Sequence, residues 1–197
     1  MLKRVFDVAI VLLAAPLTVP VVALTAIVLA VELRGNPFYL QARIGRNGEP
    51  FTIYKLRTMR HASPGEVSDY RVDDWSTYIF SPPGVVDPRI TRMGAFARAK
   101  SLDELPNLLN VLKGEMSLVG PRPEIPELVE QYPAEYHERH KVLPGITGLA
   151  QVHGRSDLTY AESASYDLQY VRTHSFMGDL RLLGLTARLA LTGEGAR

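Results

Sequence analysis

The stretch VAIVLLAAPLTVPVVALTAIVLAV, residues 8–31, contains no charged side chain and decides the architecture of the chain. At about 1.5 Å per residue, a helix over this run is long enough to cross a hydrocarbon layer of about 30 Å. Pro16 and Pro20 interrupt the run, and each lacks the N–H that an unbroken helix requires. Because the two prolines lie about one turn apart, they predict a single sharp kink.

Three interpretations of this run compete. A cleaved signal peptide agrees with the basic start at Lys3 and Arg4, but the run is long for one and no small-x-small cleavage site follows. A straight transmembrane helix would send one basic flank, either Lys3 and Arg4 or the arginines from Arg34 onward, across the membrane. A helix that enters, breaks near the prolines and returns keeps both flanks in the cytoplasm, and we favour this re-entrant structure. Its freed carbonyls need a hydroxyl such as that of Thr18, or packed protein, as partners.

Composition narrows the possible functions. The chain has 197 residues, 22 Lys and Arg against 21 Asp and Glu, and a net charge of +1, which indicates one domain and argues against nucleic-acid binding through a general basic field. The absence of cysteine excludes disulfides, thiolate metal sites and a cysteine nucleophile. The pattern His137-Glu138-Arg139-His140 is not the HExxH zinc motif, and we expect the histidines to lie on the surface.

The remaining residues predict an α-rich α+β fold. Asn47-Gly48 predicts a β-hairpin with a type I′ turn, and its strands are expected over residues 38–44 and 51–57. On the second strand Lys55 and Arg57 share a face, where they are either solvated or directed at phosphates.

Helices are expected over four further segments, and the last of these begins with the capping box Thr159-x-x-Glu162. The segments are residues 103–112, 125–131, 134–140 and 160–172. Residues 61–90 have the composition of a long loop. Residues 177–191 predict an amphipathic helix, which either lies in the membrane interface or packs on the core.

The stretch SLDELPNLLNVLKGEMSLVGPRPE, residues 101–124, contains the candidate chemistry. Asp103 and Glu104 stand at a helix start, and the pattern Ser101-x-x-Glu104 also matches a capping box, so a structural role competes with a chemical one. An ionised carboxylate there could attack phosphorus or bind a divalent cation such as magnesium. Arg122, fixed between Pro121 and Pro123, is a preorganised donor for a phosphate or a base edge.

Six motifs follow one another along the chain: Lys3-Arg4-Val5-Phe6-Asp7, Gln41-x-Arg43-x-Gly45, Tyr54-Lys55-Leu56-Arg57-Thr58-Met59, Arg98-x-x-Ser101-Leu102-Asp103-Glu104-Leu105, Asn110-Val111-Leu112-Lys113-Gly114-Glu115-Met116-Ser117-Leu118-Val119-Gly120-Pro121-Arg122-Pro123 and Pro144-Gly145-Ile146-Thr147-Gly148. In this order they closely resemble the motifs of the bacterial sugar transferase family, the monotopic phosphoglycosyl transferases of the small single-domain type. The resemblance extends from the N-terminus to about Leu183, and only the loop over residues 61–90 is particular to this chain.

The resemblance implies a membrane enzyme that transfers a sugar 1-phosphate from a UDP-sugar to polyprenol (undecaprenyl) phosphate and releases UMP. It implies that Asp103 is the nucleophile and a magnesium ligand, that Glu104 is its partner, and that Arg122 with Pro121 and Pro123 binds the uridine end. Further contacts to phosphates and to the two carboxylates are expected from Arg98, Lys55 and Arg57. The resemblance assigns no clear role to Asp167 or Asp179.

The resemblance also implies an organisation and a location. Residues 1–36 would form the re-entrant membrane helix, and residues 37–197 a catalytic domain with interfacial helices on the cytoplasmic face of the bacterial inner membrane. The family breaks its re-entrant helix at a Ser-Pro pair, whereas this chain has Val19-Pro20, so Thr18 and Pro16 are the expected substitutes. Two other functions compete: a non-enzymatic membrane adaptor that binds anionic lipid, and a UDP-sugar hydrolase. The resemblance specifies neither the sugar nor the oligomeric state.

Overall fold

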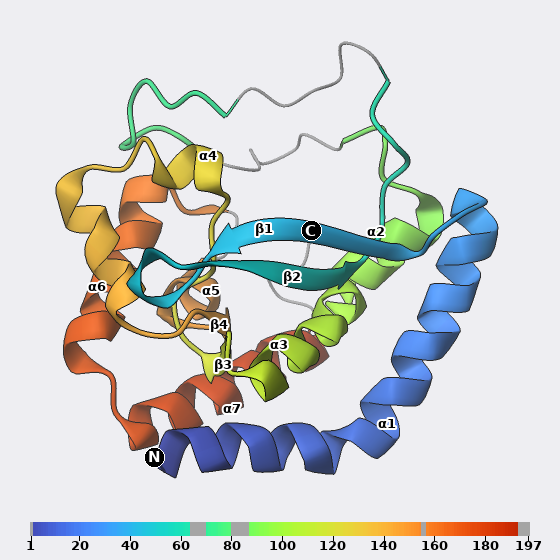
Figure 1. Ribbon diagram of the computed structural model, residues 1–197, viewed down its shortest axis with the longest axis horizontal. Coiled ribbons are helices and arrows are strands. Elements are labelled where there is room, and N and C mark those ends of the chain that lie inside the picture. The colour runs from blue at the N-terminus through green and yellow to red at the C-terminus, as the bar shows by residue number, and fades with distance from the viewer. Residues whose placement is uncertain (1, 64–69, 80–86, 155–156, 193–197) are drawn as a thin grey trace.

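The computed structural model describes residues 2–63, 70–79, 87–154 and 157–192, and it is a helix-rich α+β structure (Figure 1). Its elements in chain order are α1 (Leu2–Leu33), β1 (Phe38–Ile44), the 3₁₀ turn η1 (Arg46–Gly48), β2 (Pro50–Leu56), α2 (Arg92–Ala99), the 3₁₀ helix η2 (Leu102–Asn107), α3 (Leu108–Lys113), β3 (Ser117–Val119), α4 (Pro126–Val129), the 3₁₀ helix η3 (Ala134–Lys141), β4 (Gly145–Thr147), α5 (Leu149–His153), α6 (Tyr160–Thr173) and α7 (Phe176–Thr192). Part of the predicted loop over residues 61–90 falls outside the described residues.

The first helix bends sharply partway along its length (Figure 1), and both Pro16 and Pro20 lie inside it. By the helical i to i−4 pattern, these prolines leave the carbonyls of Leu12 and Pro16 without their N–H partners. The Thr18 hydroxyl donates a hydrogen bond at 3.1 Å to a different carbonyl, that of Ala14. Our expectation that Thr18 bonds a freed carbonyl is therefore wrong, because a hydroxyl on a helix reaches its own i−4 carbonyl.

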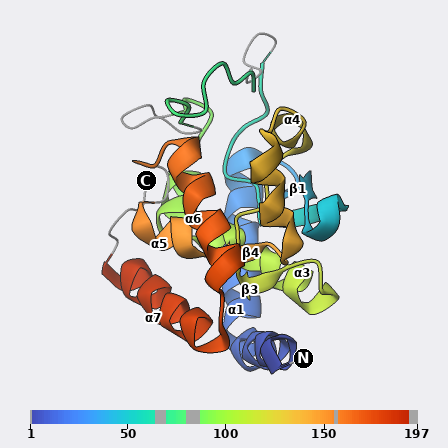
Figure 2. The same ribbon diagram turned by 90° about the vertical axis from the view of Figure 1, so that its left-hand side faces the viewer.

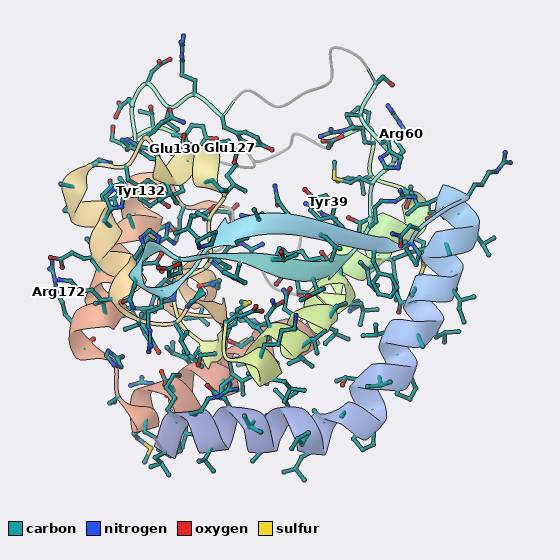
Figure 3. All side chains as sticks on the ribbon, in the orientation of Figure 1. Tyr39, Arg60, Glu127, Glu130, Tyr132 and Arg172 are labelled. Carbon is teal, nitrogen blue, oxygen red and sulfur yellow. The ribbon has the colours of Figure 1, made fainter. Side chains whose placement is uncertain are left out.

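Both ends of α1 contact the rest of the domain. Near its start, Lys3 forms an ion pair with Asp179 of α7 at 2.5 Å. Near its end, the Glu32 carboxylate accepts a hydrogen bond at 3.1 Å from the backbone N–H of Met93 in α2. Between these ends many side chains stand outward (Figure 3). The exposed large apolar side chains of α1 are Leu2, Val5, Ile10, Leu12, Leu13, Leu17, Val19, Leu24, Ile27, Val28 and Val31. Its length and apolar composition are sufficient for a membrane span.

The predicted hairpin is present, with β1 and β2 antiparallel and in register from Phe38 opposite Leu56 to Ile44 opposite Pro50. Asn47 and Gly48 both have positive φ, at 60° and 79°. The N–H of Glu49 closes the turn on the Arg46 carbonyl at 3.2 Å, as a type I′ turn requires. The turn prediction is confirmed, and the second strand begins and ends one residue earlier than expected.

The segment predicted as one helix over residues 103–112 is two helices, η2 followed by α3. Pro106 lies inside η2 and cannot donate a backbone hydrogen bond, which disfavours a continuous α-helix. The predicted 125–131 helix is the shorter α4, and 134–140 is the 3₁₀ helix η3. The helix over 160–172 is present as α6, and its capping box between Thr159 and Glu162 is confirmed. Helices α2 and α5 were not predicted.

A short parallel pair, β3 and β4, was also not predicted, and it joins two of the quoted motifs. The backbones approach very closely at three glycines. A Cβ on Gly145 would lie 2.1 Å from the Gly120 nitrogen, and one on Gly148 would lie 2.3 Å from the Gly120 oxygen. Contacts under 3.0 Å are sterically forbidden, so the glycines of both motifs are needed to place the segment after β3 against β4.

We expect Gly145→Ala to lower the free energy of unfolding by about 3 kcal/mol, because the methyl group overlaps backbone atoms that cannot move aside. Thermal unfolding in detergent micelles measures this change. Gly184→Ala in α7 is the matched control, since an added Cβ there meets no atom within 4 Å. The control should be neutral or stabilising by about 0.5 kcal/mol, and equal losses in both variants would contradict the packing argument.

Candidate functional site

The side chain of Glu104 is held between two cations. Its Oε1 atom accepts hydrogen bonds from Lys55 Nζ of β2 and from Arg122 Nη2, each at 2.9 Å. Burial alone would raise the pKa of Glu104, but the charges of Arg122 and Lys55 outweigh it and hold that pKa well below its usual range. Glu104 is therefore ionised at neutral pH, and its carboxylate fixes the position of both cations.

Asp103 has different surroundings, although it is adjacent in the chain. Within the described residues, its carboxylate makes no hydrogen bond or ion pair. Burial, and then the negative charge of Glu104, raise the pKa of Asp103 to about 6, against the opposing charges of Lys55, Arg98 and Arg122. Burial and the neighbouring carboxylate therefore outweigh the three cations in setting the pKa of Asp103. Asp103 is the more basic carboxylate and the one available to a ligand.

The predicted capping box at Ser101 is wrong. Ser101 has a left-handed backbone with φ of 53°, and its side chain caps nothing. Glu104 makes its bonds with Lys55 and Arg122 instead of turning back to the helix start. The two acidic residues do lie in the first turn of η2, as predicted, but their side chains are not used as caps.

The Pro121-Arg122-Pro123 loop is held by its backbone oxygens. The Gly145 N–H donates to the Pro121 oxygen at 2.8 Å. Arg139 Nη2 donates to the Arg122 oxygen at 2.9 Å, and Arg43 Nη1 donates to the Pro123 oxygen at 3.1 Å. With both prolines buried, these contacts fix the loop while the Arg122 side chain remains 45% exposed, which leaves it accessible to a ligand.

Arg139 was not identified as a site residue from the sequence, where it lies in a polar segment between two histidines that we expected on the surface. It is buried, it forms an ion pair with Asp167 of α6, and it donates to the hydroxyls of Tyr132 and Tyr160. The Trp75 ring packs against both tyrosines, at centroid distances of 5.5 and 4.8 Å. Tyr132 is labelled in Figure 3, beside the helices that enclose this cluster. Through the hydrogen bond from Arg139 to the Arg122 oxygen, this cluster of Arg139, Asp167, Tyr132, Tyr160 and Trp75 holds the Arg122 loop in place.

A hollow beside Glu104 opens between β2, η2 and the Arg122 loop. Two of the atoms of its lining residues, Asn107 Oδ1 and Arg43 Nε, are buried and have no hydrogen-bond partner among the described residues. Buried polar atoms are usually paired, so a water molecule or a polar ligand group is the expected partner of each of these two atoms. The lining residues are Arg43, Ile53, Lys55, Glu104, Asn107, Met116, Arg122, Pro123, Gly145 and Ile146. No sequence pattern identified Asn107, because its significance comes from burial.

The other predicted cations are distributed around this centre. Arg98 of α2 acts electrostatically on Asp103, and its Nη1 lies 3.5 Å from the Thr58 hydroxyl. Arg57 instead contacts His61, with Nη1 at 2.7 Å from the ring Nε2. Within the described residues it forms no hydrogen bond or ion pair with Asp103 or Glu104. Lys55, Arg98 and Arg122 are thus gathered around the two carboxylates, while Arg57 lies at the margin.

No group of three or more His, Asp or Glu side chains among the described residues is arranged to hold a metal ion. Asp103 alone offers an unbonded carboxylate at the centre of the site. A magnesium ion there would therefore take most of its ligands from substrate phosphates and water, which is the usual coordination of magnesium in phosphoryl-transfer sites. The residues present fit a cation that arrives with a phosphorylated substrate.

The sequence is similar to those of several known proteins. UDP-glucose:undecaprenyl-phosphate glucose-1-phosphate transferase of Caulobacter vibrioides is 39% identical, over 98% of this chain and 71% of that protein. The sugar transferase EpsL of Bacillus subtilis is 38% identical, over 98% and 89%. UDP-N-acetylgalactosamine-undecaprenyl-phosphate N-acetylgalactosaminephosphotransferase of Aeromonas hydrophila is 37% identical, over 100% of this chain and 45% of that longer protein. The family model for bacterial sugar transferases matches residues 1–193, and the chain therefore belongs to that family.

Proposed function

We propose that this protein transfers a sugar 1-phosphate from a UDP-sugar to undecaprenyl phosphate through a covalent intermediate on Asp103. The observation that carries the proposal is the contrast between the two carboxylates, since Glu104 is bonded to two cations and Asp103 is left unbonded with a raised pKa. The names of the Caulobacter and Aeromonas relatives support the donor and acceptor classes.

In the first half-reaction, an Asp103 carboxylate oxygen attacks the phosphorus atom that bears the sugar. A P–O bond forms to Asp103, and the P–O bond to the bridging oxygen breaks, so UMP leaves with that oxygen. A pKa of about 6 suits this role, because Asp103 is mostly ionised at pH 7 and is still more nucleophilic than an ordinary aspartate.

In the second half-reaction, a phosphate oxygen of the lipid attacks the same phosphorus atom. The bond to Asp103 breaks, the carboxylate is regenerated, and the product is a lipid diphosphate sugar. No water or other reactant enters either step. The enzyme thus works by a ping-pong sequence.

Glu104 acts in this proposal as a positioning group and not as a base. Its low pKa leaves it without affinity for a proton at neutral pH, and its carboxylate aligns Lys55 and Arg122 beside Asp103. Those cations can then bind the oxygens of the diphosphate and stabilise charge that develops during transfer. Arg98, which acts electrostatically on Asp103, is the third candidate for this task.

Magnesium, when bound at Asp103 together with the donor diphosphate, would reduce the repulsion between the anionic nucleophile and the anionic substrate. Asp103 is the one protein ligand that we assign to it.

We further propose that α1 enters and leaves the membrane on the cytoplasmic face. Its two ends contact one domain, through Lys3 with Asp179 and through Glu32 with Met93, which a straight span could not do with the domain on one side. The bend and the outward apolar side chains support the same arrangement (Figures 1 and 3). Helices α2, α3 and α7 also carry exposed apolar side chains, among them Phe96 on α2. Such side chains are typical of helices that lie in the membrane interface.

A cysteine-labelling experiment tests this arrangement. The sequence contains no cysteine, so each introduced cysteine is the only thiol that can react. Leu2→Cys and Asn36→Cys should react with a membrane-impermeant maleimide from the same side of sealed vesicles as the control Glu49→Cys in the hairpin turn. Leu17→Cys, near the bend, should be protected from both sides. Reaction of the two ends of α1 from opposite sides would contradict the re-entrant structure.

UMP release in the absence of the lipid acceptor distinguishes the proposed transferase from the two other functions, a membrane adaptor and a UDP-sugar hydrolase. A membrane adaptor would release no UMP from a UDP-sugar. A hydrolase would release UMP continuously without lipid, whereas the proposed transferase should release about one UMP per enzyme and then stop until undecaprenyl phosphate is added.

We expect Asp103→Asn to lower UMP release by a factor on the order of 10³ or more, because the amide cannot act as the nucleophile. Folding should be preserved, since the Asp103 carboxylate makes no hydrogen bond in the described chain, and thermal unfolding checks this. Asp73→Asn, which makes the same substitution at an exposed aspartate, is the control and should retain full turnover. Normal turnover by Asp103→Asn would defeat the covalent mechanism.

The pH dependence follows from the raised pKa of Asp103. In a ping-pong reaction, kcat/KM for the UDP-sugar reports only the first half-reaction, and it should fall about tenfold per unit as pH drops below about 6, because Asp103 becomes protonated. In Glu104→Gln the negative neighbour is lost, so the pKa of Asp103 should fall and the acid limb should move to lower pH. An acid limb unchanged by this substitution would contradict the electrostatic account.

A further inference from the structure

We infer that Lys3 and Asp7, at the start of the membrane helix, are positioning residues for the loop that carries Arg122. The inference rests on the proposed function and extends it, since it makes binding of the nucleotide donor depend on how the start of α1 docks. The contacts that carry it lie at the two ends of β3.

The first contact is between Asp7 and Ser117, the residue that begins β3. The Ser117 hydroxyl donates to Asp7 Oδ2 at 2.7 Å, and the two residues are 0% and 2% exposed. A carboxylate is costly to bury, and this one is buried against the strand instead of lying on the open face of its helix. The contact fixes the first residue of β3 to the second turn of α1.

The second contact is at the other end of the strand. Lys3 Nζ donates to the Val119 backbone oxygen at 3.1 Å and to Asp179 Oδ2 at 2.5 Å. The Tyr170 hydroxyl donates to the same Val119 oxygen at 3.0 Å. Figure 2 shows α7, which carries Asp179, meeting the start of α1. One helical turn of α1 therefore holds both the last carbonyl of β3 and the start of α7.

The path from this strand to Arg122 is short and stiff. Only Gly120 and Pro121 stand between Val119 and Arg122. The Gly120 N–H donates to the Thr147 oxygen at 2.9 Å, and a Cβ on Gly120 would lie only 2.3 Å from the Leu143 oxygen, so the backbone at Gly120 is held directly against its neighbours. Pro121 has a fixed φ. A displacement of β3 would consequently be passed on to Arg122 and would change its 2.9 Å contact with Glu104.

This role is distinct from retaining a basic flank on the cytoplasmic side. Arg34, at the other end of α1, carries the same charge as Lys3 and is exposed, but it makes no side-chain hydrogen bond or ion pair within the described residues. A variant of Arg34 therefore tests the flanking charge alone, while variants of Lys3 and of Ser117 test the contact with β3.

The experiment measures the dissociation constant of UMP, by calorimetry, for the full chain in lipid nanodiscs. Lys3→Met and Ser117→Ala should each weaken UMP binding at least about fivefold, because small displacements of a positioned group weaken the contacts it makes severalfold. Lys3→Arg should restore most of the affinity, and Arg34→Gln should bind UMP as the unmodified protein does. Ser117→Ala leaves the buried Asp7 carboxylate without its donor and should lower the unfolding temperature. Thermal unfolding and the membrane-bound fraction are therefore measured alongside, and UMP affinity is compared at a temperature at which every variant is folded and membrane-bound.

Equal UMP affinity in Lys3→Met, Ser117→Ala and the unmodified protein would overturn the inference. The same loss in Arg34→Gln would also overturn it, because flanking charge alone would then be responsible. Failure of the proposed function looks different, since in that case the unmodified protein itself would not bind UMP. Combining Asp7→Ala with Ser117→Ala should weaken binding no further than the larger single effect, and additive losses would show that Asp7 does not act through Ser117.

Discussion

The carboxylate of Glu104, bonded to Lys55 and Arg122, is the interaction on which the site depends. One oxygen atom joins a strand, a 3₁₀ helix and the rigid proline loop, and these come from distant parts of the sequence. The same contacts give Glu104 and Asp103, which are adjacent in the chain, different pKa values. Glu104 has its charge compensated and a low pKa, while Asp103 is left with a raised pKa and an unbonded carboxylate. In many enzymes, two carboxylates in different environments have different pKa values and therefore different roles in the reaction.

The rest of the fold keeps this centre rigid while one side of the molecule remains apolar. Close backbone approach at Gly120 and Gly145 sets the loop against β4, and Arg139 and Arg43 bind its carbonyl oxygens. The bent helix α1 contacts the same domain at both of its ends. In the proposed re-entrant arrangement, the site lies at the membrane surface, where a water-soluble nucleotide sugar and a lipid phosphate can both reach it.

The hairpin turn, the start of α6 and the kinked first helix could be predicted from the sequence, because each is determined by residues that are close together in the chain. Asn47-Gly48 specifies a tight turn, Thr159 and Glu162 specify a helix start, and the apolar run with Pro16 and Pro20 specifies a kinked helix. The capping box at Ser101 failed for a physical reason. The same pattern there is overridden by two cations that arrive from elsewhere in the chain and bind Glu104 more strongly than a backbone N–H would.

Features that depend on contacts between distant parts of the chain could not be predicted from the sequence. The three-residue strands β3 and β4 have too few residues to show a period, and Arg139 has a polar sequence context although it is buried. Arg57 was grouped with Lys55 by strand alternation, but β2 ends before it and its side chain meets His61. Family resemblance supplied the chemistry, and the contacts between Glu104, Lys55 and Arg122 supply a physical reason for it.

The central claim is that Asp103 becomes covalently linked to the sugar phosphate. Intact-protein mass spectrometry after incubation with a UDP-sugar and magnesium, without lipid acceptor, tests it most directly. The account predicts a mass increase of one sugar phosphate, located on the peptide that contains Asp103, which disappears when undecaprenyl phosphate is added. Turnover of the donor with no such adduct, or an adduct on another residue, would contradict the account.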